Sequence, residues 1–502
     1  MPKLSVATLE QVPPAVARPA YAIDALRTGI VHLGIGAFHR AHQAIYTDDA
    51  IASAGGAWGI CGVSLRSPDV RDRLMPQDGL YTAIEKSPAG VNRRIVGSVR
   101  DVLFLPAAQS DVLDWIIAPE TKIVSLTVTE KGYCHSPATG RLAADHPDIV
   151  HDLANPAQPR SVAGLLVAAL DARRRAHGTP LTIVCCDNLT QNGAFVAGIV
   201  VAFASLRDAE LADWIGREIA FPSTMVDRIV PATTAADIAD NDAALGVADA
   251  ACVVHEPFAQ WVIEERFANG RPAWEAGGAL FVDHVDAYEA MKLRLLNASH
   301  SAFAYLGFLA GYEYVYEVAA QPDFVAYMRR LMQHEVAPTL AQPAGIDLAA
   351  YRESLVERFA NPALPHKTQQ IAMDGSQKLP QRLLGTIRDG IAAGRRIHFA
   401  ALAVAAWMRY VYGEDEKGRP IEIADPMAPT FAKLAAQHRG RPAEFAQSLL
   451  AIDAIFDEDL HNEPRFTTPV IAFVEELFAH GAAKTLARSL HADNAFPPPR
   501  TR

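Results

Sequence analysis

The amino-acid sequence predicts an α/β domain built on a parallel β-sheet, followed by a second domain that is mainly α-helical. Short runs rich in β-branched residues alternate with helical segments over the first 285 residues. That alternation is typical of βαβ units and a parallel sheet. Strand patterns nearly vanish after about residue 285, and the rest of the chain shows the apolar periodicity of helices of ordinary length.

The expected strands cover residues 30–33, 58–64, 122–129 and 181–186. In the first domain, helices are expected from about residue 38 and over 162–175. In the second they are expected over 286–311, 322–337, 348–359, 382–394, 398–412, 427–437, 442–455 and 467–490. We therefore predict a surface lead-in at 1–27, a dinucleotide-binding domain at 28–285, a helical domain at 286–495 and a disordered tail at 496–502.

Composition and charge narrow the classes of function. The chain has 502 residues, of which 50% are hydrophobic and 21% charged, as in ordinary globular proteins. This excludes a disordered chain, a collagen-like fibre and a small disulfide-stapled domain. The net charge of −11 argues against broad electrostatic binding to nucleic acid or to an anionic membrane. It still permits a local basic pocket for an anionic substrate.

The cysteines and the apolar runs bear on the compartment. The five cysteines form no CxxC pair and lie mostly in apolar runs, so we expect buried thiols of a reducing compartment and no structural zinc. The N-terminus lacks a continuous apolar stretch, and the longest apolar runs are shorter than the roughly 18 residues of a spanning helix. We predict a soluble, cytoplasmic protein.

A glycine pattern follows the first expected strand and opens a helix. Gly34 suits a tight turn, and Gly36 lets backbone N–H groups approach a pyrophosphate at the helix N-terminus. His39 stands where a GxGxxG motif has its third glycine, so a plain strand–turn–helix is the alternative. On the Rossmann-type interpretation, the residues of this turn that bind the cofactor are Gly34, Ile35, Gly36, Ala37 and Phe38.

The second strand bears on the choice of cofactor. It is followed by Asp69, a candidate acceptor for the adenosine ribose hydroxyls, which favours NAD. Arg66 is placed to meet the 2′-phosphate of NADP instead, or is a solvated surface cation. The spacing from Gly36 to Asp69 is 33 residues, longer than the usual value of about 20. We expect NAD, with NADP the less favoured alternative.

The segment 286–310 carries the residues that suit catalysis. Asp286-x-x-Glu289 resembles a capping box that starts a helix. At about 100° per residue, Glu289, Lys292, Asn297 and His300 fall within one arc of roughly 140° that also holds leucines. Four polar groups on a semi-apolar face must be paired or functional. The alternative is that Glu289 only caps the helix, Lys292 reaches solvent and His300 is a core imidazole.

These residue types suit the interconversion of an alcohol and a carbonyl. A desolvated Lys292, its pKa lowered toward neutrality, is the expected general base for the hydroxyl proton while hydride passes to a nicotinamide. Asn297 and His300 are expected to donate hydrogen bonds to the developing oxyanion. No metal is required. Tyr288-x-x-x-Lys292 matches the YxxxK of short-chain dehydrogenases but lies too far along the chain from Gly36 for that fold.

The spacing Lys292-x4-Asn297-x2-His300, within MKLRLLNASHSAFAYLG, resembles the catalytic signature of the polyol-specific long-chain dehydrogenases. This is the mannitol dehydrogenase and fructuronate reductase family. Further segments are similar to its blocks: GIGAFHRAHQAIYTD, SLTVTEKGY, CDNLTQNG, FPSTMVDRIVP, EPFAQWVIEERFANGRPAW and DGSQKLP. The resemblance spans about residues 28–415. It implies a Rossmann-type domain, a helical C-terminal domain, a nicotinamide cofactor and no catalytic metal.

The resemblance also implies roles for individual residues. Lys292 matches the general acid/base, and Asn297 and His300 match the groups that polarise the carbonyl. Asn188, Asp227 and Lys378 match positions that contact the polyol. Glu289 matches an acid beside the catalytic lysine, and Asp69 and Glu130 match cofactor-binding positions. Pro68 replaces an acid of the mannitol dehydrogenases, which leaves NADP open.

The substrate is the least determined feature. Gln370 stands where mannitol dehydrogenases have arginine, and HKTQQIAMDGSQKLPQRLL is closer to fructuronate reductases. A uronate carboxylate needs a cation, which Lys367, Lys378 or Arg382 would supply, although Arg382 is alternatively a surface cation. We favour reduction of D-fructuronate to D-mannonate by NADH, with the mannitol–fructose pair as the alternative.

Two interpretations of other classes stay open. One is a non-catalytic NAD(H)-binding protein, and the other is a zinc alcohol dehydrogenase using His39 and His42. The expected partner is a small sugar alcohol, ketose or hexuronate, with no nucleic acid and no membrane. Length and charge are compatible with a monomer.

Overall fold

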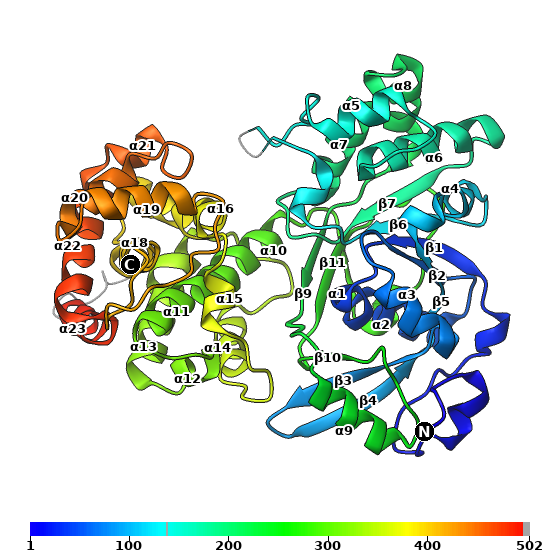
Figure 1. The fold of residues 1–502 in the computed structure, drawn as a ribbon, viewed down its shortest axis with the longest axis horizontal. Helices are drawn as coiled ribbons and strands as arrows, with labels where there is room; N and C mark the ends of the chain where they lie inside the picture. Colours follow the sequence, from blue (N-terminus) through cyan, green and yellow to red (C-terminus); the bar gives the residue numbers. More distant parts are fainter. Residues whose placement is uncertain (137–138, 495–502) are drawn as a thin grey trace. The chain divides into compact units, whose positions relative to one another are not determined.

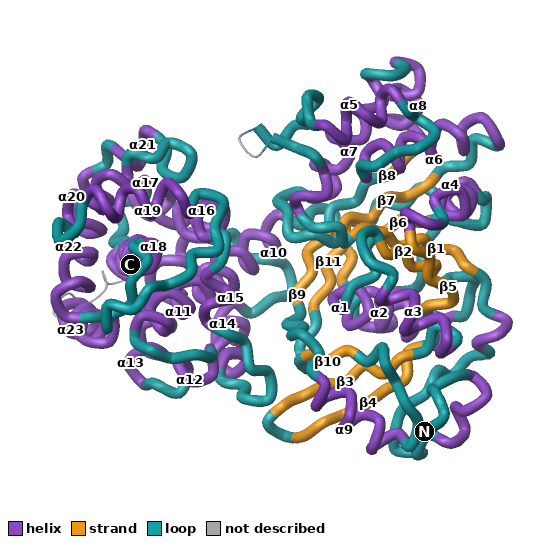
Figure 2. The backbone as a smooth tube through the Cα atoms, viewed as in Figure 1, coloured by secondary structure: helices purple, strands orange, loops and turns teal. Residues whose placement is uncertain are grey.

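The computed structural model describes residues 1–136 and 139–494. It divides into two compact units, Met1–Asp286 and Ala287–Arg502. Within the described residues, all the β-strands lie in the first unit (Figure 2). The second unit is helical, which confirms the predicted fold class. The tail predicted at 496–502 lies outside the described residues.

The centre of the first unit is a six-stranded sheet in which every neighbouring pair is parallel (Figure 1). Its order is β5-β2-β1-β6-β7-β8, the strand order of a Rossmann fold. The strands are β1 (Thr28–Leu33), β2 (Gly59–Ser64), β5 (Val99–Phe104), β6 (Ile123–Leu126), β7 (Leu181–Cys185) and β8 (Ile219–Ala220). The four predicted strands are thus present, and they form the middle of the sheet.

Both faces of this sheet are covered because neighbouring residues of a strand point to opposite sides. Val31 and Leu33 of β1 pack in one apolar cluster with α4, α6, α7 and α8, whereas Ile30 packs in another with α2. The helices of this unit are α1 (Ala37–Ala41), α2 (Gln43–Ala54), α3 (Asp69–Leu74), α4 (Gln109–Ile117), α5 (Pro147–Ala154), α6 (Val162–Ala176), α7 (Asn192–Ser205), α8 (Ala209–Glu218) and α9 (Ala235–Leu245).

Two three-stranded sheets complete the unit, and the sequence did not predict them. One has the order β10-β3-β4 and the other β12-β11-β9. Their strands are β3 (Tyr81–Ser87), β4 (Gly90–Val96), β9 (Thr224–Asp227), β10 (Val253–His255), β11 (Gln260–Glu264) and β12 (Leu280–Val282). These strands are short or half-exposed, so they lack the apolar runs of the central sheet.

The N-terminal segment is anchored to the first unit. Leu4 and Val12 are buried, at 0% and 1% exposure, and cluster with Leu245 and Val247. The picture of residues 1–27 as a surface lead-in is therefore wrong for these side chains, because isolated apolar residues among prolines carry no periodicity that would reveal their burial.

The described part of the second unit is built from helices and contains three π-helical turns. Its helices are α10 (Asp286–Met291, beginning at the last residue of the first unit), α11 (Ala298–Leu309), α12 (Val315–Ala319), α13 (Pro322–Arg330), α14 (Leu348–Phe359), α15 (Thr368–Ala372), α16 (Gly375–Leu379), α17 (Gly385–Ala392), α18 (His398–Val411), α19 (Ala428–Gln437), α20 (Pro442–Leu450), α21 (Glu458–His461), α22 (Pro464–His480) and α23 (Ala482–Asn494). The π-helical turns are Lys292–Asn297, Leu331–Val336 and Pro380–Leu384.

The predicted helix at 467–490 is interrupted, which corrects that prediction. Gly481 separates α22 from α23 with φ of +79°, a left-handed conformation that ends the first helix. Of the helices that were not predicted, α12, α15, α16 and α21 have five residues or fewer, too few to display a helical period.

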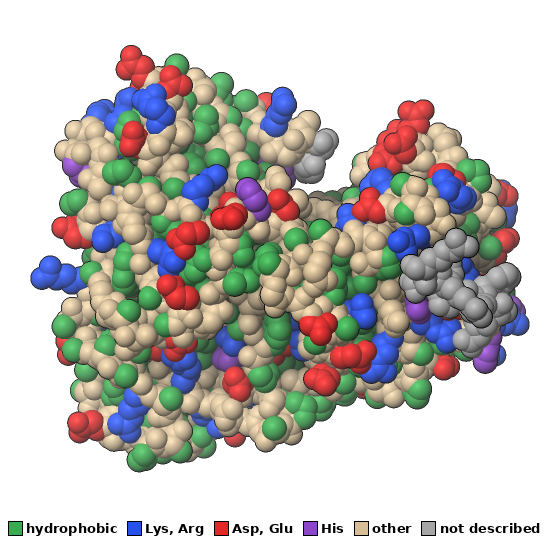
Figure 3. All heavy atoms as spheres, turned by 180° about the vertical axis from the view of Figure 1, so that it is seen from behind, with side chains coloured by type: hydrophobic (Ala, Val, Ile, Leu, Met, Phe, Trp, Pro, Cys, Tyr) green, Lys and Arg blue, Asp and Glu red, His purple; other side chains and the backbone are tan. Residues whose placement is uncertain are grey.

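The thiols and the surface complete the description. All five cysteines are buried and free, as predicted. None of the helices in the described part of the chain has the length and apolarity needed to cross a membrane. Figure 3 shows Lys and Arg side chains interspersed with Asp and Glu over the visible face. The expectations about nucleic acid, membrane and oligomeric state stay predictions.

A buried glutamate caps one of the helices of the second unit. Glu335 is 4% exposed, and its two carboxylate oxygens accept the backbone N–H groups of Phe399 and Ala400, each at 2.8 Å. These N–H groups lie in the first turn of α18, where the helix itself offers no acceptor. Burial raises the pKa of Glu335 to about 8, and the two hydrogen bonds only partly oppose this.

Because Glu335 titrates at a higher pH in the folded chain, the free energy of unfolding is expected to fall as pH rises from about 4.5 to about 8. In that window the folded chain holds a proton on Glu335 that the unfolded chain has released, so rising pH lowers the free energy of unfolding, by at most about 5 kcal/mol. Glu335→Gln has no such proton and should lose less stability between these pH values, as measured by urea denaturation. The same pH dependence in both proteins would contradict this.

Candidate active site

The predicted cofactor turn lies at the carboxyl edge of the Rossmann sheet. Gly34 follows β1 with φ of +100°, and a Cβ there would lie 2.1 Å from the carbonyl oxygen of Thr127, which follows β6. Only glycine fits at this position. A Cβ on Gly36 would meet nothing nearer than the Gly34 carbonyl oxygen at 3.8 Å. The backbone at Gly36 is therefore open to a dinucleotide, which the fold binds where its strand order reverses, between β1 and β6.

His39 occupies the place of the missing third glycine without obstructing the turn. Its fully buried ring stacks on His32 of β1, with the centroids 3.4 Å apart. Nδ1 of His32 lies 2.8 Å from Oγ of Ser125, and its Nε2 lies 2.9 Å from Oγ1 of Thr127. Burial lowers the pKa of His32 to about 3 and that of His39 well below its usual value, so both rings are neutral.

The other predicted cofactor residues follow neighbouring strands at the same edge. Arg66 and Asp69 are exposed after β2, where the Asp69 N–H donates to Oγ of Ser67 at 3.2 Å. Glu130 begins a short 3₁₀ turn after β6, and its side chain lies outside what the structure describes. Parallel strands bring all these positions to one edge, so they fit an extended dinucleotide. Their individual roles stay predictions.

The two glycines are expected to respond differently to alanine. Gly34→Ala should destabilise the fold by more than about 2 kcal/mol, because it combines a positive φ with a clash against a carbonyl oxygen. Gly36→Ala, at φ of −91°, should leave the thermal midpoint unchanged and raise the Kd for NADH about tenfold, because its methyl fills the space of a bound phosphate. Unchanged NADH affinity in Gly36→Ala would count against this position for the cofactor.

Two predicted substrate residues lie in the first unit, one in the loop after β7 and the other at the end of β9. Asn188 is exposed in the loop after β7, whereas Asp227 is the last residue of β9 and is 3% exposed. Asn192 connects the two elements. Its side-chain amide donates to the carbonyl oxygen of Thr224 at 3.0 Å and accepts the N–H of Thr224 at 2.8 Å. Asn192 was not among the predicted site residues, although it lies within the CDNLTQNG block.

In the second unit the predicted catalytic residues lie on a helix that changes its winding. Glu289, Lys292 and Asn297 are buried, at 7%, 7% and 9% exposure. The prediction of a continuous α-helix over 286–311 is wrong in its middle, because Lys292–Asn297 is a π-helical turn. There the N–H of Ala298 reaches back five residues to the carbonyl of Leu293. The wider turn brings Lys292 and Asn297 closer around the helix axis than the roughly 140° of an α-helix.

Two arginines connect this turn to other segments of the unit. Arg294, within the turn, donates to Oγ1 of Thr339 at 3.2 Å and pairs with Asp389 of α17 at 2.5 Å. Arg382, from another π-helical turn, donates to Oγ of Ser301 at 2.9 Å and to the carbonyl of Asn297 at 3.4 Å. Arg382 is therefore not the surface cation of the alternative interpretation. It lies against the helix that carries Asn297 and His300.

The buried ring of His300 packs against two rings and lies within the influence of three cations. Its ring stacks on Phe359 and meets His366 edge-on, with both centroid distances at 4.9 Å. Burial lowers the pKa of His300 well below its usual value, and His366, Arg382, Arg358 and Lys378 lower it further. His300 is therefore neutral and presents a ring N–H rather than a cation. Within the described residues its buried Nε2 has no hydrogen-bond partner.

His366 is a site residue that the sequence analysis missed. Burial and the charge of Lys378 lower its pKa to about 4, and its buried Nδ1 has no partner in the described part of the chain. Two neighbouring imidazoles thus each offer a nitrogen that has no hydrogen-bond partner among the described residues. The signal was present, because His366 opens the HKTQQ string noted for its resemblance to fructuronate reductases.

Of the remaining candidates of this unit, Lys378 acts on His300, whereas Lys367 and Gln370 lie at the surface. Lys378 of α16 is half-buried, and its Nζ donates to the carbonyl of Ile371 at 3.1 Å. Lys367 is exposed and forms an ion pair with Glu313 at 2.9 Å. Gln370 is exposed. The hydroxyl of Tyr288 donates to the carbonyl of Ala344 at 2.7 Å, in keeping with the rejection of a YxxxK motif.

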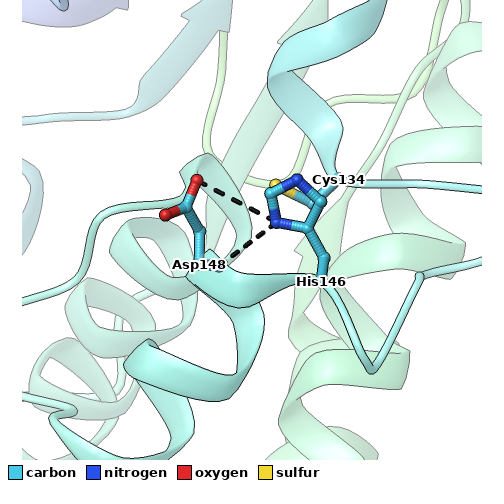
Figure 4. Close-up of side chains that lie close together, drawn as sticks. All are labelled: Cys134, His146 and Asp148. Carbon is cyan, nitrogen blue, oxygen red and sulfur yellow. Dashed lines mark hydrogen bonds and ion pairs between the residues drawn. The ribbon is translucent and has the colours of Figure 1, made fainter.

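One group in the first unit brings together residue types that bind metals. One ligand atom each of Cys134, His146 and Asp148 lies within 4.8 Å of the others (Figure 4). His146 Nδ1 accepts the N–H of Asp148 at 3.2 Å and thereby caps α5. Burial raises the pKa of the Cys134 thiol to about 11, so it is protonated.

His39 and His42, which suggested a zinc enzyme, have other partners. The ring of His39 stacks on His32. The ring of His42 stacks on Phe38, and its Nε2 hydrogen-bonds the carbonyl oxygen of Gln260 at 3.1 Å.

A Rossmann sheet with an open glycine turn, in one chain with a helical unit that carries a buried lysine, asparagine and histidine, is the pattern of a dinucleotide-dependent dehydrogenase. Comparison with known proteins agrees. Residues 28–276 match the model of the mannitol dehydrogenase Rossmann domain, and residues 284–478 match that of the mannitol dehydrogenase C-terminal domain.

Individual relatives cover nearly the whole chain. D-mannonate oxidoreductase of Escherichia coli is 45% identical over 94% of this chain and 98% of its own. Mannitol 2-dehydrogenase of Pyricularia oryzae is 41% identical over 94% of each. The structure of Pseudomonas fluorescens mannitol 2-dehydrogenase in ternary complex with NAD and D-mannitol aligns with a TM-score of 0.89 at 44% identity, over 97% of this chain and 99% of that one.

The chain therefore belongs to the mannitol dehydrogenase family. It is an oxidoreductase that acts on CH–OH groups, and its Rossmann domain binds NAD. The predicted family, fold, enzyme class and cofactor are thus confirmed, and the substrate is known only as a polyol or an aldonate.

Proposed function

We propose that this enzyme is a fructuronate reductase, which interconverts D-fructuronate and NADH with D-mannonate and NAD. The observation that carries the proposal is the positive charge around His300. Three permanent cations, Arg358, Lys378 and Arg382, act on that ring, and Arg382 donates to the hydroxyl of Ser301, the next residue along the helix, at 2.9 Å. A sugar carboxylate would neutralise this charge, whereas a neutral polyol would not.

The proposed chemistry uses three side chains of one helix. Bound NAD supplies the hydride acceptor for oxidation. Lys292 takes the hydroxyl proton as hydride leaves and returns it in the reduction. Asn297 and neutral His300 donate hydrogen bonds to the oxygen at which negative charge develops. Glu289, three residues before Lys292 and equally buried, is proposed as the acid beside that lysine.

The remaining predicted substrate residues are assigned by the chemistry of their side chains. Asn188, Asp227 and Lys378 are assigned to the sugar chain, and Arg382 to the carboxylate. Arg382 suits that role because a guanidinium binds a carboxylate with two parallel hydrogen bonds. The relative that is named D-mannonate oxidoreductase supports this assignment. The similarity to mannitol 2-dehydrogenases supports the alternative, oxidation of D-mannitol to D-fructose.

Steady-state kinetics with NADH distinguishes the two. We expect kcat/KM for D-fructuronate to exceed that for D-fructose by about 100-fold or more, because the neutral sugar leaves the cations without their anion. A preference for D-fructose would establish the mannitol alternative. Binding of NADH without turnover of either sugar would favour a non-catalytic NAD(H)-binding protein.

A further inference from the structure

The turn that follows β6 contains a backbone conformation that side chains rarely adopt. Thr129 has φ of +69° and ψ of +156°, a region populated almost only by glycine. A β-branched residue is especially unfavourable there. The turn lies where the strand order reverses, and Thr127 within it contacts Gly34 through its carbonyl and donates from Oγ1 to the Gly34 carbonyl at 2.8 Å. The strained residue thus lies two residues beyond the one that contacts the glycine turn.

Asp187 supplies the contacts that maintain this conformation. Its carboxylate accepts the N–H of Val128 at 3.0 Å, the N–H of Thr129 at 2.9 Å and the hydroxyl of Tyr133 at 2.6 Å. Burial raises the pKa of Asp187, while these donors act in the opposite direction. The carboxylate follows β7, so it bridges the carboxyl ends of two neighbouring strands. Strained residues persist when their surroundings determine them in this way.

The same residue is joined to the substrate side of the unit. The carbonyl of Asp187 accepts the side-chain amide of Asn192 at 3.1 Å, and that amide also bonds Thr224 of β9. Asn188 comes next in the chain, and β9 ends at Asp227. Asp187 therefore stands between the turn beside Gly34 and the two first-unit residues assigned to the sugar.

We propose that Asp187 is a positioning residue that holds the Val128–Thr129 turn in the shape against which NAD binds. Its carboxylate fixes two successive peptide N–H groups, so the peptide groups that follow β6 keep one orientation at the edge of the sheet. If the turn relaxes and this strain is released, the binding constant that depends on its shape is expected to change by roughly 5- to 150-fold. The inference rests on NAD binding by the Rossmann domain and is independent of the proposed substrate.

The test is a double-variant cycle read out by NADH fluorescence titration without sugar. Asp187→Asn is expected to raise the Kd for NADH about tenfold or more, because one acceptor oxygen becomes an N–H₂ group that faces a donor. Thr129→Gly removes the strain, so adding it to Asp187→Asn should recover most of the lost affinity. KM for NADH should follow the Kd, with kcat at saturating NADH changed less than about threefold.

Tyr133→Phe is the matched control, because it removes a donor to the same carboxylate and leaves both backbone bonds. It should keep the NADH Kd within about twofold of wild type. Wild-type affinity in Asp187→Asn would overturn the proposal. So would a loss that Thr129→Gly fails to recover, since Asp187 would then act only through the core. If Asp187→Asn does not fold, the double variant is expected to fold and bind NADH, and its failure to do so would also overturn the proposal.

Discussion

Replacing Lys292 by alanine is expected to lower kcat by roughly 10²- to 10⁴-fold, the contribution of a general acid/base, while the Kd for NADH stays within about twofold of wild type. The amine is the side chain assigned to the proton, and it lies in the helical unit, whereas NAD binds the Rossmann sheet. Transient kinetics with D-mannonate or D-mannitol and NAD, together with NADH titration, measures both quantities.

Two further variants separate proton transfer from charge and from general destabilisation. Lys292→Arg keeps the positive charge but cannot release a proton, so it should be as inactive as the alanine variant. Lys433→Ala changes an exposed lysine of the same unit and should retain wild-type kcat. Full activity in Lys292→Arg would mean that the charge matters and that the proton passes elsewhere.

Arg382→Gln is expected to reduce kcat/KM for D-fructuronate by roughly 10- to 100-fold and that for D-fructose by less than about threefold. The reason is that glutamine keeps a donor toward Ser301 but loses the charge assigned to the carboxylate. Parallel kinetics on the two sugars measures the difference.

The control for this variant is Arg388→Gln, on the following helix, where the arginine forms a half-exposed ion pair with Asp457. That change should leave both sugars unaffected, because exposed ion pairs contribute little. An equal loss on both sugars in Arg382→Gln would show that Arg382 only holds the catalytic helix through Asn297 and Ser301. The carboxylate would then need a different partner.

The sequence predicted the parts of the fold whose pattern is local. Strands β1, β2, β6 and β7 lie in the middle of a parallel sheet, are buried on both faces and appear as continuous apolar runs. The hairpin of β3 and β4 was missed because the first three residues of β4 are exposed and the strand carries Asn92 and Arg93 in place of a continuous apolar run. Its identity depends on pairing with β10, which is distant in the chain.

The site shows the same division. Lys292, Asn297 and His300 could be selected from their spacing, and Gly34 and Gly36 from the turn chemistry. The π-helical turn could not be predicted, because the local spacing of apolar residues is that of an α-helix, and the contacts of Arg294 and Arg382 around the turn join residues far apart in the chain. The strain at Thr129 is invisible in a sequence for the same reason, since Asp187 comes from another strand end.

The central claim is that the amine of Lys292 moves the substrate proton. Rescue of Lys292→Ala by small primary amines tests it most directly, with saturating NAD and whichever of D-mannonate and D-mannitol is the better substrate. We predict that turnover rises in proportion to the concentration of unprotonated amine and falls off for amines too bulky for the vacated space. A variant that turns over at nearly the wild-type rate without added amine, or that no amine restores, would contradict the claim.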